Sequence, residues 1–488
     1  MSIMPGNPHI WQYGQQLFGW CLLWGGLTFA PLSLAAERID LLVGDSTWTV
    51  TMTDVVTWVS SGTPQGSLTP LAQVLAPPAL AELRHWLTQP VPLPPAQRQR
   101  LLHTEAGSQV FQRLGQFLVP PDPQALKQAF TLVLHHQKPL TALQVLQAFP
   151  AETVTIDALA VANVLVSLQT HQQQTTQAVN SLPLLPPTGV PRKLTGTSWR
   201  EHLLIFTPPE RPQRALKVNL LIPNGVQRVP VVLLSHGIGQ TGRSLLYVGE
   251  YLASQGMAAA VITHPAQSGL SEFSERPHDI RHVLDYLAQQ PQAQRLHRER
   301  VGVLGHSFGG YTALVAAGAQ PQRSELARQC QQELAVLNLS LVLLQCRALE
   351  LNPWPVVHPD PRIRAVVAIN PAIGGILGAS GLSSVRVPVL LIGGGNDWVT
   401  PVLSEQIQPF RGLRGQPHYL VILPTAQHID GLDELRQFSP PRLPPIPQAL
   451  AHLSWEFFRT HLLPHSVPLT PERLRQPTLP LRVQTAPP

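Results

Sequence analysis

The chain has 488 residues, more than one ordinary domain needs, and it is 44% apolar but only 13% charged. Its net charge of +6 comes without a long run of Lys or Arg and without aromatic residues among basic ones, so nothing specific favours nucleic-acid binding. A generally basic surface suits weak attraction to anionic membrane surfaces.

Residues 1–36 are predicted to be a secretory signal or an N-terminal membrane anchor. They contain no Lys, Arg, Asp or Glu, and an apolar stretch over 17–30 is followed by small residues, with a cleavage site at 33–35. The lack of Lys and Arg ahead of the apolar stretch departs from the usual signal pattern and keeps the anchor open. Either form predicts an exported protein, periplasmic or extracellular.

Residues 37–180 are predicted to form a small all-helical domain. Thr53 is expected to cap a helix that starts at Asp54, and apolar residues recur with helical spacing over 126–134. Further helices are expected at 79–88, 95–117, 140–148 and 156–168. This region shows no Cys/His ligand spacing and no prominent carboxylate pair, so it predicts no metal site.

Residues 181–197, which are rich in proline, are expected to be a linker. Beyond them the pattern predicts strands at 200–206, 214–222, 230–235, 258–263, 300–304, 364–369, 387–393 and 418–423. The first two strands suit a hairpin, whereas the later ones alternate with helices and predict a parallel sheet. Residues 198–464 are therefore predicted to adopt an eight-stranded α/β-hydrolase fold. The Pro-rich tail, 465–488, is expected to be loose.

A nucleophile elbow is predicted at 305–310, which read Gly-His-Ser-Phe-Gly-Gly between an apolar strand and a small-residue helix. Such a turn strains Ser307 and lifts its hydroxyl clear of the sheet, while Gly305 and Gly309 let the strand and helix approach closely. The bare motif arises by chance in roughly one chain in seven of this length. The strand before it and the helix after it favour Ser307 as a nucleophile, with His306 completing the elbow.

The loop Leu-Ser-His-Gly-Ile-Gly-Gln at 234–240, after the third strand, is predicted to supply an oxyanion donor. Gly237 lets the backbone turn its amides inward, so the Ile238 N–H is expected to act together with the Phe308 N–H at the start of the elbow helix. His236 could instead be a base, but at this position it is expected to order the loop through hydrogen bonds.

Asp397 and His428 are the predicted acid and base. A serine hydroxyl needs a base, and the base needs an orienting acid. Asp397 follows an apolar strand and a glycine turn, and His428 follows the next strand, which is the order that this fold uses. The other place for the acid, after the sixth strand, holds Asn370, which cannot be a carboxylate. The triad Ser307, Asp397 and His428 requires no metal and no cofactor.

Residues 320–362 are an insertion that carries Cys330 and Cys346. In an exported protein this pair suggests a disulfide bond, with two buried free thiols as the alternative. One continuous helix would separate the two residues by ~24 Å, so a bridge requires the chain to fold back near Asn338. The insertion leaves the far end of the elbow helix, opposite the catalytic loops. The glycine-rich loop 370–384 is the better candidate for a mobile pocket wall.

The elbow and the Ser-His-Gly-Ile-Gly loop resemble the platelet-activating-factor acetylhydrolase group of α/β-hydrolases. Asn-Asp-x-x-Thr-Pro at 396–401 is similar to the acid loop of dienelactone-hydrolase and cutinase-like enzymes. The layout also resembles a bacterial family of exported hydrolases with a helical domain ahead of the catalytic one, ending here in 149–157. Asn370 and the 320–362 insertion depart from the acetylhydrolase pattern.

The resemblance implies hydrolysis of a small-molecule or lipid carboxylic ester, without a metal. The sequence thus predicts an exported serine esterase or lipase-like hydrolase, with no protein partner identified. Two alternatives stay open, namely a peptidase or other acyl hydrolase that uses the same triad, and a non-catalytic binding or scaffold protein.

Overall fold

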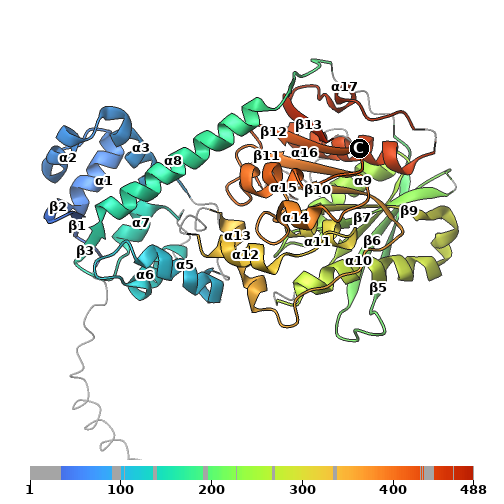
Figure 1. The fold of residues 1–488 in the computed structure, drawn as a ribbon, viewed down its shortest axis with the longest axis horizontal. Coiled ribbons are helices and arrows are strands. Elements are labelled where there is room, and N and C mark those ends of the chain that lie inside the picture. Colours follow the sequence, from blue (N-terminus) through green and yellow to red (C-terminus); the bar gives the residue numbers. More distant parts are fainter. Residues whose placement is uncertain are drawn as a thin grey trace, which may run out of the picture. The chain divides into compact units, whose positions relative to one another are not determined.

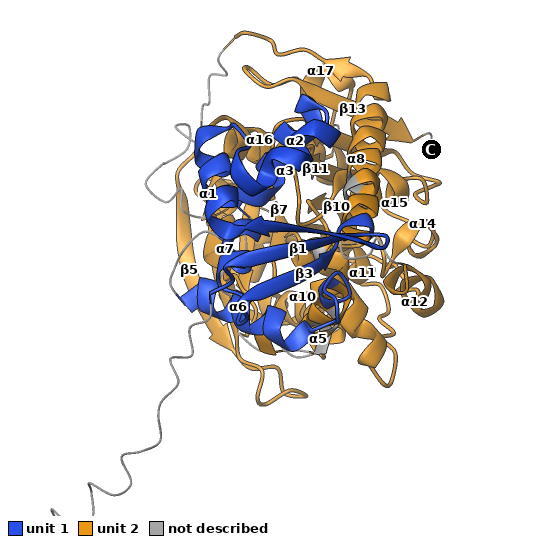
Figure 2. Cartoon of the chain, turned by 90° about the vertical axis from the view of Figure 1, so that its left-hand side faces the viewer, with its two compact units in different colours: residues 1–92, 114–159 blue, residues 93–113, 160–488 orange. Residues whose placement is uncertain are grey.

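The computed structural model describes residues 35–90, 101–103, 105–135, 140–190, 196–226, 228–265, 270–332, 338–428, 430, 432, 444–464 and 466–486. The predicted signal or anchor lies outside the described residues, apart from its last two. Two compact units divide the chain: unit 1 has residues 1–92 and 114–159, and unit 2 has residues 93–113 and 160–488 (Figure 2). Within the described ranges, no helix is long and apolar enough to cross a membrane.

Unit 2 contains a ten-stranded sheet in the order β4-β13-β12-β11-β10-β9-β7-β8-β6-β5 (Figure 1). In chain order its strands are β4 (Leu184–Leu185), β5 (Trp199–Phe206), β6 (Leu216–Pro223), β7 (Val229–Ser235), β8 (Ala258–Thr263), β9 (Leu296–His306), β10 (Ile363–Ile369), β11 (Val389–Gly394), β12 (His418–Leu423) and β13 (Leu481–Ala486). The run β8-β7-β9-β10-β11-β12 is parallel, and the strands outside it pair antiparallel. Every predicted strand is present, and the α/β-hydrolase fold is confirmed.

The sheet is larger than predicted because the tail joins it. β13 pairs antiparallel with β12 on one side and with β4, from the predicted linker, on the other. Leu481 and Val483 are buried, and the short helix α17 (Pro471–Leu474) precedes this strand. The prediction of a loose tail is wrong, because alternating apolar and polar residues over 481–485 make a strand despite the prolines around them.

Helices cover both faces of the sheet. α9 (Leu246–Ser254) and α16 (Pro445–Leu462) form one apolar cluster with residues of the central strands. The strands contribute alternate residues to this cluster, such as Val232 and Ile392. α11 (Phe308–Ala316) packs on β9 and β10 and contacts α10 (Glu272–Gln289). Burial on both faces explains why the parallel strands read as continuous apolar runs.

Several short helices lie in the connections between the strands of unit 2. They are η2 (Gly242–Leu245), η3 (Pro291–Arg295), α12 (Arg323–Cys330), α13 (Leu339–Leu343), η5 (Gln345–Glu350), α14 (Gly378–Leu382), η6 (Leu403–Ile407) and α15 (Gln408–Phe410).

Unit 1 is not all-helical, which corrects the sequence prediction. It contains a three-stranded sheet, β2-β1-β3, made of β1 (Arg38–Val43), β2 (Ser46–Thr51) and β3 (Thr153–Asp157). β1 and β2 form an antiparallel hairpin, and β3 pairs parallel with β1. The turn of the hairpin includes Gly44, whose φ of +60° favours a residue without a side chain.

The helices of unit 1 lie between β2 and β3 along the chain. They are α1 (Met52–Ser61), η1 (Gly66–Leu68), α2 (Thr69–Val74), α3 (Pro77–Thr88), α6 (Pro123–His135) and α7 (Ala142–Gln147), with α5 (Glu105–Gly115) crossing the unit boundary. The cap of α1 is Thr51 rather than Thr53, because the Thr51 hydroxyl accepts a hydrogen bond from the Asp54 N–H.

The predicted domain boundary near residue 180 is also corrected. α8 (Ala158–Ser181) continues through the polar stretch 169–180, and the two units divide between Leu159 and Ala160. That stretch has no Gly or Pro, and glutamines are good helix formers, so polarity alone does not end the helix.

Candidate active site

Ser307 occupies a strained turn between β9 and α11. Its φ of +56° and ψ of −120° lie in a region that residues with side chains rarely adopt, and the side chain is 6% exposed. A Cβ on Gly305 would collide with the carbonyl of Gly309, and a Cβ on Gly309 would collide with the carbonyl of Ser235. The glycines at these positions therefore allow the close packing that a nucleophile elbow needs.

Asp397 and His428 lie together at the carboxyl ends of β11 and β12. His428 Nδ1 is 2.7 Å from Asp397 Oδ2, and both residues are buried. Asp397 Oδ1 accepts hydrogen bonds of 2.8 Å from the N–H groups of Val399 and Thr400. The Thr400 hydroxyl donates to Asp397 Oδ2 over 2.6 Å. Three donors without charge thus hold this carboxylate against the imidazole.

Asn370, which replaces a carboxylate in the alternative acid position, connects the neighbouring loops. Its Oδ1 accepts from the Gly394 N–H over 2.9 Å, and its Nδ2 is 3.5 Å from the carbonyl oxygen of Gln427. Asn370 has a φ of +43°, a conformation that Asn tolerates better than most residues. It therefore ties the end of β11 to the segment just before His428.

His306 holds the base loop next to the elbow. Its Nε2 is 3.0 Å from the carbonyl oxygen of His428, and the two ring centroids are 4.9 Å apart. Burial, followed by the nearby His428, lowers the pKa of His306 to about 3. A neutral His306 therefore donates to the His428 carbonyl and ties the loop that carries His428 to the elbow.

The loop 236–240 lies against Ser307 on its other side. A Cβ on Gly237 would be 3.2 Å from the Cβ of Ser307. Among the hydrogen bonds of the described residues, none has the Ile238 N–H or the Phe308 N–H as its donor. Both groups are therefore available to an oxygen atom.

The ring of His236 fixes the orientation of one peptide in this loop. The backbone N–H of His264 donates to His236 Nε2 over 3.1 Å, so the hydrogen of the neutral ring must be on Nδ1. Nδ1 is 2.7 Å from the carbonyl oxygen of Gly237, to which it donates. Burial, followed by the charge of Arg276, lowers the pKa of His236 well below its ordinary value. His236 thus orders the loop and is not placed as a base.

That hydrogen bond also sets the direction of the Ile238 N–H. The Gly237 carbonyl and the Ile238 N–H belong to one planar peptide unit, and in a trans peptide they point in opposite directions. Because His236 holds the carbonyl, the N–H faces the other way.

The insertion 320–362 reaches the acid loop. Cys330 and Cys346 form a disulfide with a Cα–Cα distance of 5.9 Å, and the Ser340 N–H donates to the carbonyl of Val399 over 3.0 Å. The expectation that the insertion lies opposite the catalytic loops is therefore wrong. The chain folds back at 338–345 and supports the segment that carries Asp397.

The glycine-rich loop 370–384 is anchored by two buried side chains. Glu405 Oε2 accepts 2.6 Å hydrogen bonds from the N–H groups of Ile373 and Gly374. Gln345 Oε1 accepts 2.9 Å hydrogen bonds from the next two N–H groups, at 375 and 376. These four bonds argue against the mobile pocket wall that the glycines suggested.

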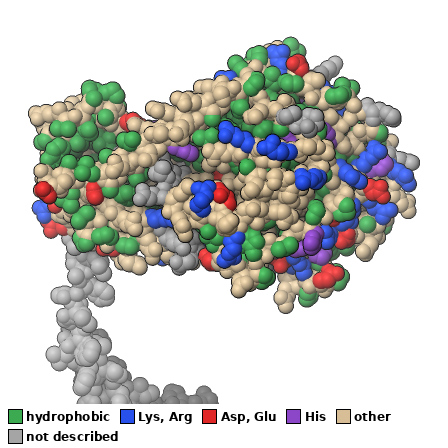
Figure 3. All heavy atoms as spheres, viewed as in Figure 1, with side chains coloured by type: hydrophobic (Ala, Val, Ile, Leu, Met, Phe, Trp, Pro, Cys, Tyr) green, Lys and Arg blue, Asp and Glu red, His purple; other side chains and the backbone are tan. Residues whose placement is uncertain are grey.

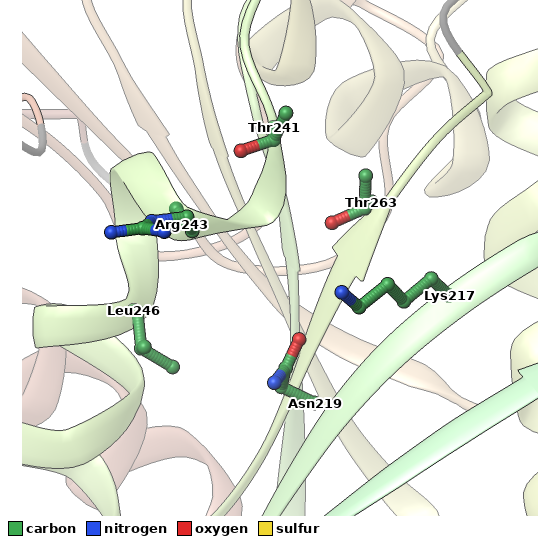
Figure 4. A pocket seen from close by; sticks show the side chains of 6 residues that line it. All are labelled: Lys217, Asn219, Thr241, Arg243, Leu246 and Thr263. Carbon is green, nitrogen blue, oxygen red and sulfur yellow. The ribbon is translucent and has the colours of Figure 1, made fainter.

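Two cavities lie away from Ser307. One of about 240 Å³ is lined by Lys217, Asn219, Thr241, Arg243, Leu246 and Thr263 (Figure 4). Thr241 lies at the end of the oxyanion loop, so this basic cavity adjoins that loop but includes no predicted triad residue. The other, of about 460 Å³, includes Arg300, Arg364 and Pro388, near the amino-terminal side of the sheet.

Two family models match the chain. "Alpha/beta hydrolase of unknown function (DUF1400)" matches residues 35–157, and "PET hydrolase-like" matches residues 222–333. The second range contains the oxyanion loop and the elbow but neither Asp397 nor His428. With the ten-stranded sheet and its strained elbow, these matches decide the superfamily. The chain is an α/β-hydrolase.

Curated relatives of this α/β-hydrolase are similar over part of their length. Cutinase 2 of Thermobifida cellulosilytica is 28% identical over 182 residues, which are 37% of this chain and 52% of the relative. Cutinase cut1 of Thermobifida fusca is also 28% identical, over 37% of this chain and 42% of the length of that cutinase. Bis(hydroxyethyl) terephthalate hydrolase of Streptomyces coelicolor is 26% identical over 37% of this chain and 44% of the relative. The chain spans about half the length of these relatives.

Sequence reasoning missed several residues of this hydrolase site. Thr400 was part of the acid-loop motif, but nothing in the motif alone showed that its hydroxyl contacts Asp397. His264 and Arg276, which contact His236, lie after β8 and within α10. The sequence offers one indication of them, which is that charged and imidazole side chains follow an apolar strand. This pattern does not predict that they contact His236.

Proposed function

We propose that this α/β-hydrolase cleaves carboxylic esters with Ser307 as nucleophile, His428 as base and Asp397 as orienting acid. The observation that carries the proposal is the 2.7 Å hydrogen bond between His428 Nδ1 and Asp397 Oδ2, in a loop that His306 holds beside the strained Ser307. The bond leaves Nε2 of His428 as the nitrogen that accepts a proton from Ser307.

In the proposed first step, Ser307 Oγ attacks the ester carbonyl carbon while His428 Nε2 takes the hydroxyl proton. The carbonyl oxygen becomes an oxyanion, which accepts hydrogen bonds from the N–H groups of Ile238 and Phe308. The intermediate then expels the alcohol, which receives the proton from His428. Asp397 stabilises the imidazolium that exists between the two proton transfers.

The second step returns the enzyme to its starting state. Water gives its proton to His428 and adds to the acyl-enzyme carbonyl, which again places an oxyanion between the same two N–H groups. Collapse of this intermediate breaks the bond to Ser307 Oγ, releases the carboxylic acid and returns the proton to the serine. All of these steps use side chains and amides of the chain itself.

Uncharged carboxylic esters are the proposed substrates. The similar proteins are named cutinases and bis(hydroxyethyl) terephthalate hydrolase, and the names of all of them denote ester hydrolysis. Trp398, which follows Asp397 in the chain, is 45% exposed, and we propose that it contributes an aromatic surface to the binding of the acyl or alcohol part of such a substrate.

A fluorophosphonate probe together with a panel of esters tests this function. Wild-type protein should be labelled and should hydrolyse p-nitrophenyl esters between acetate and palmitate, and bis(hydroxyethyl) terephthalate should be tried beside them. Ser307→Ala should lose labelling and all turnover. Equal labelling of Ser307→Ala would reject Ser307 as the nucleophile. Cleavage of amides without cleavage of esters would favour a peptidase.

We also propose that the protein works in an oxidising compartment outside the cytoplasm. The bond between Cys330 and Cys346 supports this, because disulfides persist in such compartments and are rare in the cytosol. Mass spectrometry of protein collected from the periplasm or medium, with and without reduction, would test both the location and the bond.

A further inference from the structure

A cluster of buried charged side chains lies behind the oxyanion loop. Its members come from α10, from the segment before β6 and from the segment after β8, and each is at most 5% exposed: Arg214, His264, Glu272, Arg276 and Asp279. Charged groups are rarely buried unless they are paired, so the position of such a cluster calls for an explanation.

Side chains of opposite charge alternate along a chain of hydrogen bonds in this cluster. Arg214 donates to Glu272 over 2.7 Å and to both oxygens of Asp279 over 2.6 and 2.7 Å. Glu272 accepts from Arg276 Nε over 2.9 Å. Asp279 lies 2.7 Å from His264 Nδ1, and His264 Nε2 lies 2.9 Å from the hydroxyl of Ser235.

Around Asp279, burial raises the pKa, but hydrogen bonds from His264 and Arg214 outweigh it and leave the pKa below its ordinary value. A charged Asp279 accepts the Nδ1 hydrogen of His264. Ser235, His264 and Asp279 thus form a hydrogen-bonded relay, and each is at most 2% exposed, less than any residue of the proposed triad.

Arg276 is the member of the cluster that contacts both His236, which orients the first proposed oxyanion donor, and Phe308, which carries the second. Its Nη1 donates to the carbonyl oxygen of His236 over 2.8 Å, just before the Gly237–Ile238 peptide. Its guanidinium carbon lies 5.1 Å from the centre of the Phe308 ring, within the range of a cation–π interaction. One side chain therefore contacts the residue that orients the first donor and the residue that carries the second.

Two aromatic neighbours fix the orientation of the Phe308 ring that Arg276 contacts. Phe273 packs edge-on against the Phe308 ring at 4.9 Å, and Tyr311 stacks parallel to it at 5.2 Å. The Tyr311 hydroxyl donates to the carbonyl of Phe273 over 3.0 Å. With these neighbours fixed, a shift of Arg276 would displace the ring of Phe308 and the N–H at the start of α11.

We infer that Arg276 is a positioning residue that sets the distance between the two halves of the oxyanion hole. Glu272 fixes one edge of its guanidinium, the His236 carbonyl takes a second donor, and the flat face meets Phe308. Lysine has a single point of charge and no flat face, so it cannot replace these contacts together. The inference rests on the proposed hydrolase function, since it concerns the donors that this function requires.

An oxyanion hole with misplaced donors stabilises the transition state less, whereas substrate binding in the ground state changes little. Loss of one complete donor costs about 10²–10³ in kcat in serine hydrolases. We therefore expect Arg276→Lys to lower kcat by about 10-fold and Arg276→Gln by about 100-fold, with KM within about 3-fold of wild type.

The test compares these variants with Arg211→Gln, a control at an arginine that borders the charged cluster through Asp279. Arg211 pairs with Glu275 over 2.6 Å and with Asp279 over 3.2 Å, and no hydrogen bond or ring contact joins it to His236 or Phe308. Turnover of a p-nitrophenyl ester is divided by the amount of Ser307 that a fluorophosphonate labels at its end point, so unfolded protein does not count. Affinity for an alkyl boronic acid, whose serine adduct is tetrahedral, is measured in parallel.

Support would be a fall in kcat per labelled serine for both Arg276 variants, an equal fall in boronate affinity and near-normal values for Arg211→Gln. Unchanged kcat per labelled serine in Arg276→Gln would overturn the inference. Should Arg276→Gln not fold, Phe308→Leu decides, because it removes the ring that Arg276 contacts but keeps the N–H. A normal kcat in that variant would also overturn the inference. A wild-type protein that is inert to esters and to the probe would instead reject the proposed function itself.

Discussion

The two sides of Ser307 are built from different kinds of interaction. On the acid–base side, Asp397 is held by two backbone N–H groups and one hydroxyl. On the oxyanion side, the loop that carries Ile238 rests on Arg276 and on the charged cluster behind it. One side uses neutral donors around a single charge, and the other uses paired charges.

The difference follows from what each side has to do. In the proposed mechanism a proton moves between Ser307 and His428, and a second charge close to Asp397 would change the driving force of that transfer. The oxyanion side has no proton to move, but its amides must stay where charge develops in the transition state. Paired and buried charges suit that task, because breaking such a pair leaves an unpaired charge and costs several kcal/mol.

The largest expected effect is on the acid–base side. Asp397→Asn keeps the shape of the side chain but removes its charge, and it favours the wrong tautomer of His428, so kcat should fall by about 10³–10⁴. Asp430→Asn is the matched control in the same loop, since within the described part of the chain the Asp430 carboxylate accepts from the Gln427 N–H over 2.8 Å and makes no hydrogen bond to the proposed triad. Steady-state kinetics on p-nitrophenyl butyrate measure both. A loss below about 10-fold in Asp397→Asn would remove that residue from the triad.

The next effect probes the oxyanion side. His236→Ala removes the hydrogen bond to the Gly237 carbonyl, so the Gly237–Ile238 peptide is no longer held and kcat should fall by about 10–100-fold. KM should stay close to wild type, because the substrate carbonyl interacts weakly with these amides before attack. If His236 were instead a base, the loss would shrink at low pH, where the wild-type imidazole is itself protonated, so the pH profile of kcat separates the two roles.

A smaller change is expected at Thr400, where one neutral donor contacts Asp397. Thr400→Val keeps the volume but removes the hydroxyl, so we expect kcat to fall by about 3–10-fold and stability by about 1–3 kcal/mol. Thr131→Val is the control, because its hydroxyl donates only to a carbonyl of its own helix, at Lys127. Urea denaturation and turnover per labelled serine check both values, and equal behaviour of the two variants would contradict the role given to Thr400.

The last prediction concerns His306 and the pH dependence of stability rather than turnover. Its pKa is about 3 in the folded protein and 6.5 when unperturbed, so below pH 6.5 the unfolded chain takes up a proton that the folded chain refuses. The stability contributed by neutral His306 is complete above pH 6.5 and is lost as the pH falls towards 3. His306→Gln should therefore flatten the stability curve between pH 6.5 and 4 by up to about 1.4 kcal/mol per pH unit. Exposed His358 serves as the control in a His358→Gln variant, and a slope like wild type in His306→Gln would refute the assignment.

Sequence patterns predicted the catalytic unit better than unit 1. The strands of unit 2 are apolar runs separated by turn residues, and the elbow motif lies between a strand and a helix, so both could be placed along the chain. In unit 1 the helices dominate the pattern, and the alternating run Thr-Trp-Thr-Val-Thr at 47–51, which lies in β2, comes directly before a helix. The face of unit 1 in Figure 3 also shows many hydrophobic side chains, so burial there is a weak guide to secondary structure.

Local chemistry determined much of what the sequence could tell. Residues 305–310 specify a tight turn that only small neighbours allow, and the residues around Asp397 and His428 follow strands of a recognisable type. Such features depend on nearest neighbours along the chain, and they can be recognised without knowledge of the fold.

Only the tertiary structure decided which distant residues meet. Arg276 and His236 are separated by a helix and a strand, the insertion returns to Val399, and the tail supplies β13 beside β12. Each of these contacts joins segments that are far apart in the chain, and no repeating pattern in the sequence links them. They form because buried polar groups must find partners and because an unpaired strand edge is covered by the nearest chain that can reach it.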